Sequence, residues 1–421
     1  METTGSDFKI SSQEIKNISE LKKSIEKTSS AKITDLLGVI FGGTIDLDAS
    51  DVHIEPETEK SKIRLRIDGI LQDVAELDKE IYQNVLSRIK LLAKIKMNVS
   101  DRPQDGRFSI LFSSGKKTES PIEIRVSTLP AENGESLVLR VLNPKNLITL
   151  GDLGLRKDLL TLFRKEIKKP NGMITVTGPT GSGKTTTLYA FLKEVQKPEI
   201  KIITIEDPIE YHLPGISQTQ VKKDKGYDFA SGLKSVMRQD PDVILVGEIR
   251  DLETVNTALQ ASLTGHLVFT TLHTNDAAGT IARLISLGAN PSNIGPAVNL
   301  AVAQRLVRKV CKKCATRKSP SQEELQKIKN GPWKVLKNIK IPQTKGCEHC
   351  NGTGYKGRIG IFEAFLIDDK MEKFISTSPS ISDLREKAVK GGMTTMKEDG
   401  LMKVLEGITT LEEVERVAGE E

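Results

Sequence analysis

The sequence of 421 residues contains few cysteines, few aromatic residues and no long apolar run. No stretch approaches the roughly 18 consecutive apolar residues of a transmembrane helix. The first residues, METTGSDFKISSQE, lack the basic start and apolar run of a secretory signal. These absences predict a soluble cytoplasmic protein. The chain is 37% hydrophobic and 28% charged, an ordinary balance for a soluble protein, and its length predicts two or three domains.

The four cysteines form two C-x-x-C pairs, Cys311 with Cys314 and Cys347 with Cys350. In a cytosolic chain such pairs indicate a metal site rather than disulfides. Two knuckles of this kind can place four sulfurs around one tetrahedral Zn²⁺, and closed Cys₄ sites are structural. The alternative is two unrelated pairs of reduced cysteines. Because no cysteine lies elsewhere, we predict one zinc ion held by all four.

Acidic residues are scarce between residues 305 and 345, where thirteen Lys or Arg stand against Glu323 and Glu324. This basic segment could face anionic lipid, nucleic acid or an acidic partner. Equally, it could be a solvated surface that offsets the charge of a zinc–thiolate site. Only Trp333 could stack on a base there, which argues against a nucleic-acid motor.

The N-terminal part divides into a polar segment and a segment with regular apolar spacing. Residues 1–30 are polar and of mixed charge, so we predict a flexible arm. From Ala31, the helix-like spacing of ITDLLGVIFGGTIDL opens a smaller α+β domain over residues 31–143. Alternating apolar residues predict strands in KIRLRIDGIL, FSILF, IEIRVSTL and SLVLRVL, spacing of three and four predicts a helix in IYQNVLSRIKLLAKIKM, and SSGKKTESP has the composition of a hairpin tip.

Residues 144–152 contain Pro, Asn and Gly and predict a hinge. After it, MITVTG, KIITIE, DVILVG and HLVFTT are short β-rich runs with almost no alternation, which is typical of strands buried on both faces of a parallel sheet. Helical segments separate them, so we expect a doubly wound α/β domain over residues 153–310. The zinc segment follows at 311–350, and the C-terminal part, 351–421, is predicted to be helical from Ile381, with a helix opening at Ser380.

The segment from Gly178 to Thr185 fits G-x-x-x-x-G-K-[ST] at each fixed position, between a predicted strand and a predicted helix. Its glycines let backbone N–H groups turn toward phosphate oxygens, and the helix N-terminus adds a favourable dipole. Lys184 is expected to reach the β- and γ-phosphates of ATP, and the Thr185 hydroxyl to bind Mg²⁺. The residues predicted to bind the nucleotide here are Gly178, Pro179, Thr180, Gly181, Ser182, Gly183, Lys184, Thr185 and Thr186.

Two acidic clusters end predicted strands: one spans residues 205–210 and the other residues 247–251. Ligands bind at the carboxyl ends of parallel strands, so these clusters are candidates for holding Mg²⁺ and activating water. His266 and His273 bracket the run LVFTTL, and either could sense the γ-phosphate.

Four motifs then follow one another: the P-loop GPTGSGKTTT, the acidic box TIEDPIEY, the Gly-Glu segment RQDPDVILVGEIRDLET and the His box GHLVFTTLHTNDA. In this order they resemble the motor ATPases of bacterial type II secretion and type IV pilus assembly. The resemblance extends upstream through ASDVHIEP, RIDG and RPQDGR, and downstream through the cysteine pairs to MKEDGLMKVLEGITTLEEVERV. It covers nearly everything from about Ala31 to Val417.

The resemblance implies a fold: a RecA-like P-loop ATPase core, preceded by a smaller α+β, PAS-like domain and carrying a zinc-binding insert. It also implies site residues. Glu210 would activate water, Glu248 would act as the Walker B carboxylate, and His273 belongs to the His box. The acidic-box residues Glu206 and Asp207 would contribute to the nucleotide site, although which of Glu206, Glu210 and Glu248 activates water stays open.

Arginines of the smaller domain reach the phosphates in this family. Arg125 and Arg140 fit that role, Arg107 fits it less well, and Arg238 fits a phosphate-facing arginine of the core. Lys234 stands where relatives often carry Arg, and lysine lacks the bidentate fork. Many relatives also place a docking domain first, whereas this chain starts almost directly with the smaller domain, so how it docks to its platform stays open.

By resemblance, the protein is a hexameric ATPase, peripheral at the inner membrane, which drives a platform protein to assemble pilin-like subunits using ATP, Mg²⁺ and Zn²⁺. Retraction motors of the superfamily generally lack the cysteine knuckles, so an extension motor is expected, with no direct nucleic-acid substrate. The alternatives are a nucleic-acid-translocating ring ATPase, or a regulatory member that binds ATP without hydrolysis. The intact Lys184, Glu210 and Glu248 disfavour the latter.

Overall fold

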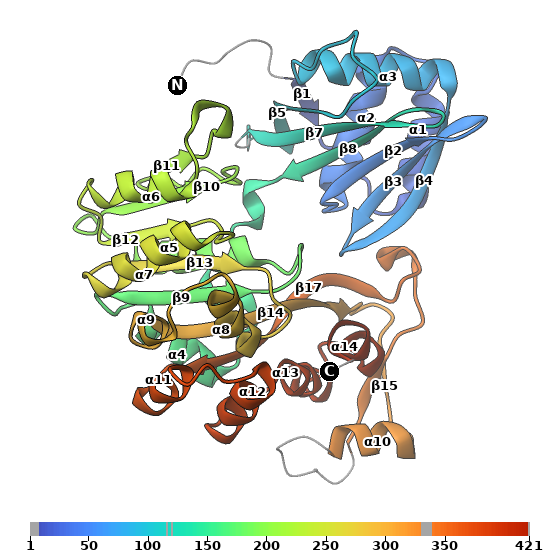
Figure 1. Cartoon of the computed structure of the whole chain (residues 1–421). Coiled ribbons are helices and arrows are strands. Elements are labelled where there is room, and N and C mark those ends of the chain that lie inside the picture. The colour runs from blue at the N-terminus through green and yellow to red at the C-terminus, as the bar shows by residue number, and fades with distance from the viewer. Residues whose placement is uncertain (1–7, 115–116, 119–120, 330–338, 420–421) are drawn as a thin grey trace. The chain divides into compact units, whose positions relative to one another are not determined.

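The computed structural model describes residues 8–114, 117–118, 121–329 and 339–419, and the chain divides into two compact units (Figure 1). The first unit comprises residues 1–146 together with 311–315 and 344–357. The second comprises residues 147–310, 316–343 and 358–421. The segments that carry the cysteines are therefore grouped with the N-terminal residues, although they are encoded far from them.

The first unit is built on an eight-stranded sheet with the strand order β1-β5-β7-β8-β2-β3-β4, in which β6 also pairs with β5. The strands are β1 (Phe8–Ser11), β2 (Asp51–Pro56), β3 (Lys60–Ile67), β4 (Ile70–Asp78), β5 (Gln104–Ser114), β6 (Lys117–Thr118), β7 (Ile122–Ala131) and β8 (Gly134–Leu142). The helices are α1 (Ile18–Thr28), α2 (Ile33–Asp46) and α3 (Lys79–Leu92), followed by the short 3-10 helix η1 (Pro144–Asn146).

Alternation over residues 60–67, 122–129 and 134–141 confirms strands β3, β7 and β8, because every second residue there is buried. The predicted strand KIRLRIDGIL is divided by a turn at Asp68 and Gly69, so its last two residues begin β4. The buried residues, among them Leu65, Ile124 and Leu139, form one hydrophobic core with apolar residues of α1, α2 and α3. Within these ranges the intervening residues are at least partly exposed, and most of them are polar or charged, Leu129 and Val138 being apolar exceptions. The sheet thus has one apolar face and one face that carries charged side chains.

The prediction of a flexible arm over residues 1–30 is wrong for the described part of that segment. Strand β1 pairs in parallel with β5, with Phe8 opposite Ile110. Helix α1 begins at an Asn17 cap whose side chain accepts the Glu20 N–H, and it buries Leu21 and Ile25. Two apolar residues four apart provide a buried stripe even in a strongly polar helix.

The helix predicted over residues 81–97 is shorter than expected. Helix α3 ends at Leu92, because the chain turns at Lys94, which adopts a φ of 56°. The predicted hairpin is present as the antiparallel pair β5–β6, with Ser113 opposite Thr118. Residues 115–116 at its tip, and residues 119–120, lie outside the described residues.

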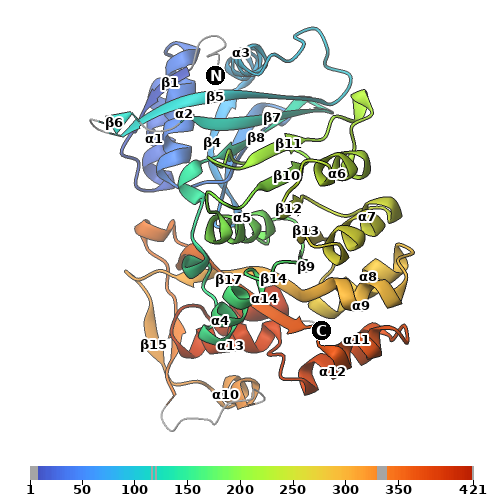
Figure 2. The same cartoon turned by 90° about the vertical axis from the view of Figure 1, so that its left-hand side faces the viewer.

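The second unit contains a seven-stranded sheet with the order β11-β10-β12-β13-β9-β14-β17 (Figure 2). Its strands are β9 (Gly172–Thr177), β10 (Ile202–Glu206), β11 (Ser217–Gln220), β12 (Val243–Val246), β13 (Leu267–Leu272), β14 (Val298–Val310) and β17 (Tyr355–Leu366), whose first residues are grouped with the first unit. Its helices are α4 (Lys157–Glu166), α5 (Lys184–Val195), α6 (Phe229–Met237), α7 (Leu252–Leu263), α8 (Ala277–Ser286) and α9 (Pro291–Ala297).

The core strands pair in parallel from β11 through β14. Every residue of β9, β10, β12 and β13 is buried, as their unbroken apolar runs predict. Two separate hydrophobic clusters cover the two faces: one includes residues of α4 and α5, the other residues of α6, α7, α8 and α9. This is the predicted doubly wound arrangement.

The rest of the second unit is a helical C-terminal part and a small sheet. The helices are α10 (Gln322–Lys329), α11 (Asp369–Ile375), α12 (Ile381–Lys390), α13 (Met396–Leu405) and α14 (Leu411–Ala418), and the two-stranded sheet pairs β15 (Thr316–Lys318) with β16 (Ile341–Gln343). Ser380 caps α12 by accepting the Asp383 N–H at 3.2 Å, which confirms the predicted start. Among the described residues, no helix is long and apolar enough to cross a membrane. Trp333 and part of the basic segment lie outside the described residues.

The predicted hinge contains the boundary between the two units, which falls between residues 146 and 147. The segment forms η1 and a second 3-10 helix, η2 (Leu150–Leu153), in which Thr149 and Asp152 form a reciprocal capping box. Hinge motion at this segment stays a prediction.

Candidate nucleotide site, arginine row and cysteine cluster

The P-loop lies at the carboxyl end of β9, and α5 begins at Lys184. Gly178 has a φ of 146°, and a Cβ there would come within 2.4 Å of the Gln304 carbonyl oxygen. Gly183 has a φ of 88°, and a Cβ there would meet the Gln304 side-chain nitrogen at 2.9 Å. Glycine is therefore required at both positions by backbone conformation and by space. The loop has the strand–loop–helix context that phosphate binding requires.

Lys184 bends back over this loop. Its Nζ donates to the carbonyl oxygens of Gly178 at 2.7 Å and Pro179 at 3.2 Å. Burial lowers the pKa of Lys184 below its ordinary value, while the nearby carboxylates of Glu248 and Glu210 act in the opposite direction. The cation and both predicted carboxylates thus belong to one electrostatic cluster.

Glu248 and His273 meet at the ends of neighbouring strands. Glu248 follows β12 and His273 follows β13, and β13 lies between β12 and β9 in the sheet. The His273 Nε2 lies 3.4 Å from Glu248 Oε2, and the Arg250 guanidinium lies 2.7 Å from Glu248 Oε1. The Glu248 side chain is only 12% exposed, so its charge is held by these two partners. Burial, followed by the charge of Lys184, lowers the pKa of His273.

The acidic box divides into an inner and an outer part. Glu206 is 4% exposed, and its carboxylate accepts hydrogen bonds from Thr204 at 2.5 Å, Gln218 at 3.2 Å and the Tyr189 hydroxyl. Burial raises its pKa above the ordinary value, although these donors act against the rise. Asp207 lies on the exposed side, 3.7 Å from the Lys223 amine. The nucleotide-binding roles of Glu206 and Asp207 stay predictions, and the Glu206 carboxylate already has three side-chain partners.

His266 cannot share the role proposed for His273. It precedes β13, whereas the P-loop follows β9, and the two strands run in parallel from Leu267 opposite Gly172 to Leu272 opposite Thr177. Six residues of strand, or roughly 20 Å, separate the two ends. The His266 ring contacts the Ala261 carbonyl oxygen at 3.0 Å. The prediction that both histidines could sense phosphate is therefore wrong for His266.

Arg238 is the C-cap residue of α6, and its side chain contacts the last turn of the same helix. Its guanidinium donates to the Lys234 carbonyl oxygen at 3.0 Å and to the Ser235 hydroxyl at 3.1 Å. Lys234, at the position where the resemblance led us to expect an arginine, pairs with Glu253 at 2.5 Å. Both side chains are exposed. A phosphate-facing role for Arg238 stays a prediction.

The predicted arginines of the smaller domain lie in one row across its sheet. Arg107 on β5 is opposite Arg125 on β7, and Arg125 is opposite Arg140 on β8. Residues directly opposite each other on neighbouring strands point to the same face. Arg107 and Arg125 also lie 3.9 and 3.8 Å from Glu123. The sequence could not show this alignment, because it depends on the register of three strands.

The four cysteine sulfurs lie together. The Sγ–Sγ distances are 3.9 Å for Cys311–Cys347, 3.8 Å for Cys314–Cys350 and 3.7 Å for Cys347–Cys350, and all four ligand atoms lie within 4.8 Å of one another. A tetrahedron with Zn–S bonds of about 2.3 Å places its sulfurs about 3.8 Å apart. The cluster therefore fits one Zn²⁺, and four thiolates with no histidine or carboxylate are a structural rather than a catalytic ligand set.

The surroundings of the sulfurs suit a thiolate ligand set. Burial opposes ionisation of Cys350, but the backbone N–H groups of Cys347 and Gly354 lower the pKa of its thiol to about 7. Burial raises the pKa of Cys314 to about 12. Ionising a thiol in this environment is unfavourable. A bound dication would offset that unfavourable free energy, since it takes thiolates as ligands.

The cysteine cluster is hydrogen-bonded to the N-terminal part of its unit. The Asn351 side chain accepts the Ile18 N–H at the start of α1 at 2.9 Å. Asp68, in the β3–β4 turn, accepts the Gly357 N–H at 2.8 Å. Asn351 directly follows the ligand Cys350, so the geometry of the knuckle and the position of α1 are connected.

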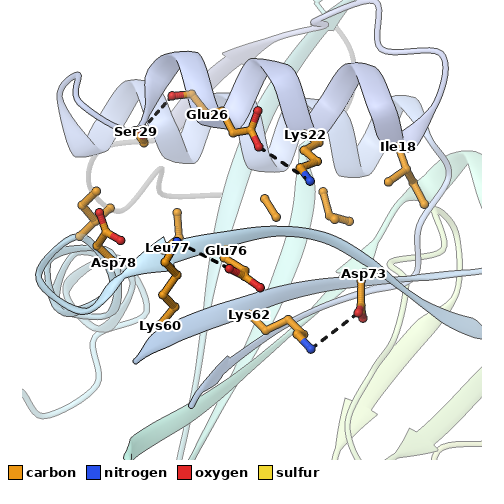
Figure 3. Close-up of a pocket in the computed structure, with 13 residues that line it drawn as sticks. Ile18, Lys22, Glu26, Ser29, Lys60, Lys62, Asp73, Glu76, Leu77 and Asp78 are labelled. Carbon is orange, nitrogen blue, oxygen red and sulfur yellow. Dashed lines mark hydrogen bonds and ion pairs between the residues drawn. The ribbon is translucent and has the colours of Figure 1, made fainter. Parts of the chain in front are cut away.

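The first unit also contains a groove of about 490 Å³ between α1 and the strands β3 and β4 (Figure 3). Its charges pair with one another: Lys22 with Glu26, Lys60 with Glu76 and Lys62 with Asp73, at 3.9, 3.7 and 3.7 Å. None of its lining residues belongs to the P-loop or the cysteine cluster. With Asp78 included, the lining carries three lysines and four carboxylates, so the groove has no excess positive charge to attract a nucleotide.

Two residues of the site were missed by sequence reasoning. Arg250 pairs with Glu248, and Gln304 on β14 accepts the Thr187 hydroxyl of α5 at 2.6 Å directly behind the P-loop. The one available signal was a glutamine in the apolar strand LAVAQRLV. Nothing in the sequence indicated that Arg250 belongs to the site, since exposed arginines beside carboxylates are common.

A P-loop on a parallel sheet, with a carboxylate and a histidine at the ends of the two adjacent strands, defines a RecA-like P-loop ATPase. The model of the type II/IV secretion system protein family matches residues 26–416. The chain belongs to this family.

Individual relatives agree with that assignment. The chain is 38% identical to the type IV pilus assembly ATPase PilB of Myxococcus xanthus, over 97% of this chain and 71% of the relative. It is 42% identical to the type II secretion system protein E of Pseudomonas aeruginosa, over 96% of this chain and 79% of the relative. Among solved structures, the pilus retraction motor PilT with bound ADP is similar at a TM-score of 0.60 and 26% identity, over 90% of this chain and 96% of that one.

Proposed function

We propose that this ATPase drives the assembly of pilin or pseudopilin fibres, as the motor of a type IV pilus or type II secretion machine. It would act as a hexamer at the cytoplasmic face of the inner membrane, through a platform protein. The observation that carries the proposal is the grouping of Lys184, Glu248 and His273 around the P-loop, in a chain about 40% identical to ATPases named for these two machines.

The P-loop residues suggest how ATP is bound. Phosphate oxygens would replace the carbonyl oxygens of Gly178 and Pro179 as partners of Lys184, and the loop N–H groups would take the remaining phosphate oxygens. Mg²⁺, when bound, neutralises phosphate charge, and the Thr185 hydroxyl and the Glu248 carboxylate are the residues that would hold it. His273, beside Glu248, is placed to respond to a phosphate that changes the charge of this cluster.

Glu210 is our choice for the residue that activates the attacking water. It is close enough to Lys184 to influence the pKa of that amine, so it belongs to the same cluster. A carboxylate near the phosphates can orient water and accept its proton. Glu248, already paired with Arg250 and His273, is better suited to holding the metal.

Arg125 and Arg140 would neutralise charge on the phosphoryl group as it is transferred, with Arg107 as a weaker candidate and Arg238 contributing from the core. Their alignment in one row supports a shared ligand, because it places three guanidinium groups on one face of the sheet, where they can act together on a phosphate group. Arginine is well suited to phosphate because its planar fork binds two oxygens.

The Cys₄ cluster, whose geometry fits one Zn²⁺, supports an assembly motor rather than a retraction motor, because by resemblance retraction motors generally lack the cysteine knuckles. Fold alone does not decide this, since the retraction motor PilT is also structurally similar. The decisive experiment is genetic and biochemical. In the source organism, deletion of the gene should abolish a surface fibre or a secreted product, and wild type but not Glu248→Gln should restore it.

A biochemical arm of the experiment identifies the partner. The purified chain should form hexamers in native mass spectrometry with ATP, and should bind the cytoplasmic domains of a platform protein encoded nearby. Single-stranded DNA should leave its ATPase rate unchanged. A rate stimulated severalfold by DNA, with no fibre phenotype, would instead support a nucleic-acid-translocating ring ATPase.

A further inference from the structure

The arginine row continues beyond Arg140 to a buried carboxylate and a fourth arginine. Asp51 on β2 lies directly opposite Arg140 on β8, and on its other side it lies directly opposite Arg66 on β3. The strands β7, β8, β2 and β3 are consecutive in the sheet (Figure 1). One face of the first unit therefore presents, in register, Arg107, Arg125, Arg140, Asp51 and Arg66.

Asp51 is the most buried member of this row. Its side chain is 4% exposed, whereas the Arg140 side chain is 50% exposed. The carboxylate accepts Arg140 Nε at 2.9 Å and the Ser50 hydroxyl at 2.8 Å, and the Arg66 Nε lies 3.6 Å away. A buried carboxylate persists only where charged or hydrogen-bonding partners compensate for lost water, and Asp51 has three.

The contact is made at the Nε atom of Arg140, at the inner end of the guanidinium. Holding Nε against a fixed acceptor restricts the last torsions of the side chain and so sets the direction of the outer end. Arg125 lies directly opposite Arg140, and like charges in such a pair are destabilising. A carboxylate on the far side of Arg140 opposes that repulsion.

We propose that Asp51 is a positioning residue for Arg140: it holds the guanidinium through Nε so that the group is oriented toward phosphate before ATP binds. The inference rests on the proposed role of Arg140 in neutralising the transferred phosphoryl group. Pre-organised charge acts on the transition state without reorganisation at the moment of reaction. Losing Asp51 should therefore lower kcat more than it changes the KM for ATP.

A double-mutant cycle in the 421-residue chain, assayed under conditions in which it hydrolyses ATP, tests the proposal. Asp51→Asn keeps the size of the side chain and removes its charge, and it should lower kcat by about 10- to 100-fold with KM within about threefold. Arg140→Ala should lower kcat at least as much. The double variant should match Arg140→Ala alone, because Asp51 acts only through Arg140.

A matched control separates positioning from folding. Glu135 is also a nearly buried carboxylate of the same unit, paired with the Lys90 amine at 2.6 Å. Glu135→Gln should lower Tm at least as much as Asp51→Asn while leaving kcat within about twofold. Equal losses of kcat in both variants would show that general destabilisation explains the effect, and would overturn the proposal.

Arg140→Lys provides a second route if Asp51→Asn does not fold. Lysine keeps the positive charge at a half-exposed position but lacks the Nε that Asp51 holds. It should lower kcat about as much as Asp51→Asn. Wild-type kcat in Arg140→Lys would overturn the proposal, as would an Asp51→Asn loss that persists undiminished in the Arg140→Ala background.

The outcomes also separate this inference from the proposed function. If Arg140→Ala hydrolyses ATP at the wild-type rate, the catalytic role of Arg140 is wrong and the positioning role falls with it. If Arg140→Ala is slow but Asp51→Asn is normal, only the positioning role is overturned.

Discussion

Glu248 and His273 lie 3.4 Å apart, although 24 residues separate them in the chain. His273 directly follows β13 and Glu248 lies two residues after the neighbouring parallel strand β12, so the sheet brings them to the same edge as the P-loop. This edge gathers one amine, one imidazole and two carboxylates within electrostatic reach of each other. The first predictions concern this cluster.

Lys184→Ala should lower ATP turnover by about a thousandfold or more, because the β- and γ-phosphates lose the P-loop cation. Phosphate release by the purified protein is the measurement. Lys193→Ala, an exposed lysine on the same helix, is the control and should behave as wild type. Wild-type turnover in Lys184→Ala would mean that ATP is hydrolysed elsewhere.

Glu210→Gln and Glu248→Gln should both retain ATP binding and lose most of their turnover, because each keeps its shape and loses its charge. The two roles are distinguished by Mg²⁺: Glu248→Gln should need more Mg²⁺ for half-maximal activity, whereas Glu210→Gln should not. Steady-state rates over a Mg²⁺ titration provide the test. If Glu210→Gln hydrolyses normally, the assignment of the water-activating residue is wrong.

Arg125→Ala should lower kcat by about a hundredfold and change nucleotide affinity little, since phosphoryl charge is greatest in the transition state. Turnover and binding of a fluorescent ATP analogue measure the two effects separately. Arg164→Ala, which removes an exposed arginine paired with Glu194, is the control. A loss confined to affinity would place Arg125 in ground-state binding instead.

Glu206→Gln should stabilise the protein relative to wild type as the pH rises above about 4.5. Burial raises the folded-state pKa of Glu206 above its ordinary value of 4.5, so its contribution to stability is complete below that value. The contribution is lost as the pH rises through the folded pKa, and glutamine has no such loss. Thermal unfolding across this pH range is the measurement, with the exposed Glu199→Gln as control. A difference in Tm that does not change with pH would contradict the prediction.

Elemental analysis should find one zinc ion per chain, and Cys311→Ser or Cys347→Ser should lose it. Because Asn351 next to Cys350 accepts the Ile18 N–H, metal loss should also speed hydrogen exchange at the start of α1. ATP turnover should fall less than tenfold, since the site is structural. Lys312→Ala, between the first two cysteines, should keep the metal. Metal-free protein with unchanged exchange at α1 would argue against the site.

Much of the second unit was predictable because its signals are local. The P-loop requires a strand, a glycine-rich loop and a helix within about twenty residues. Continuous apolar runs predict that strands β9, β10, β12 and β13 are buried on both faces of the sheet. The two C-x-x-C pairs predicted a four-sulfur cluster for the same reason. The missed arm shows the limit of this reasoning: Leu21 and Ile25 are two apolar residues in a charged segment, and their burial depends on α2 and β4.

The sequence by itself determined the chemistry of this protein: a phosphate loop, carboxylates after strands, phosphate-binding arginines and four thiolates. Only the tertiary structure decided which of these residues act together. Strand order brought Glu248 to His273, and the parallel direction of β13 and β9 excluded His266. Strand register aligned Arg107, Arg125 and Arg140 with Asp51 and Arg66. The physical reason is that pairing between strands is non-local. A shift by one residue would turn every arginine of the row to the opposite face, and no single segment carries that information.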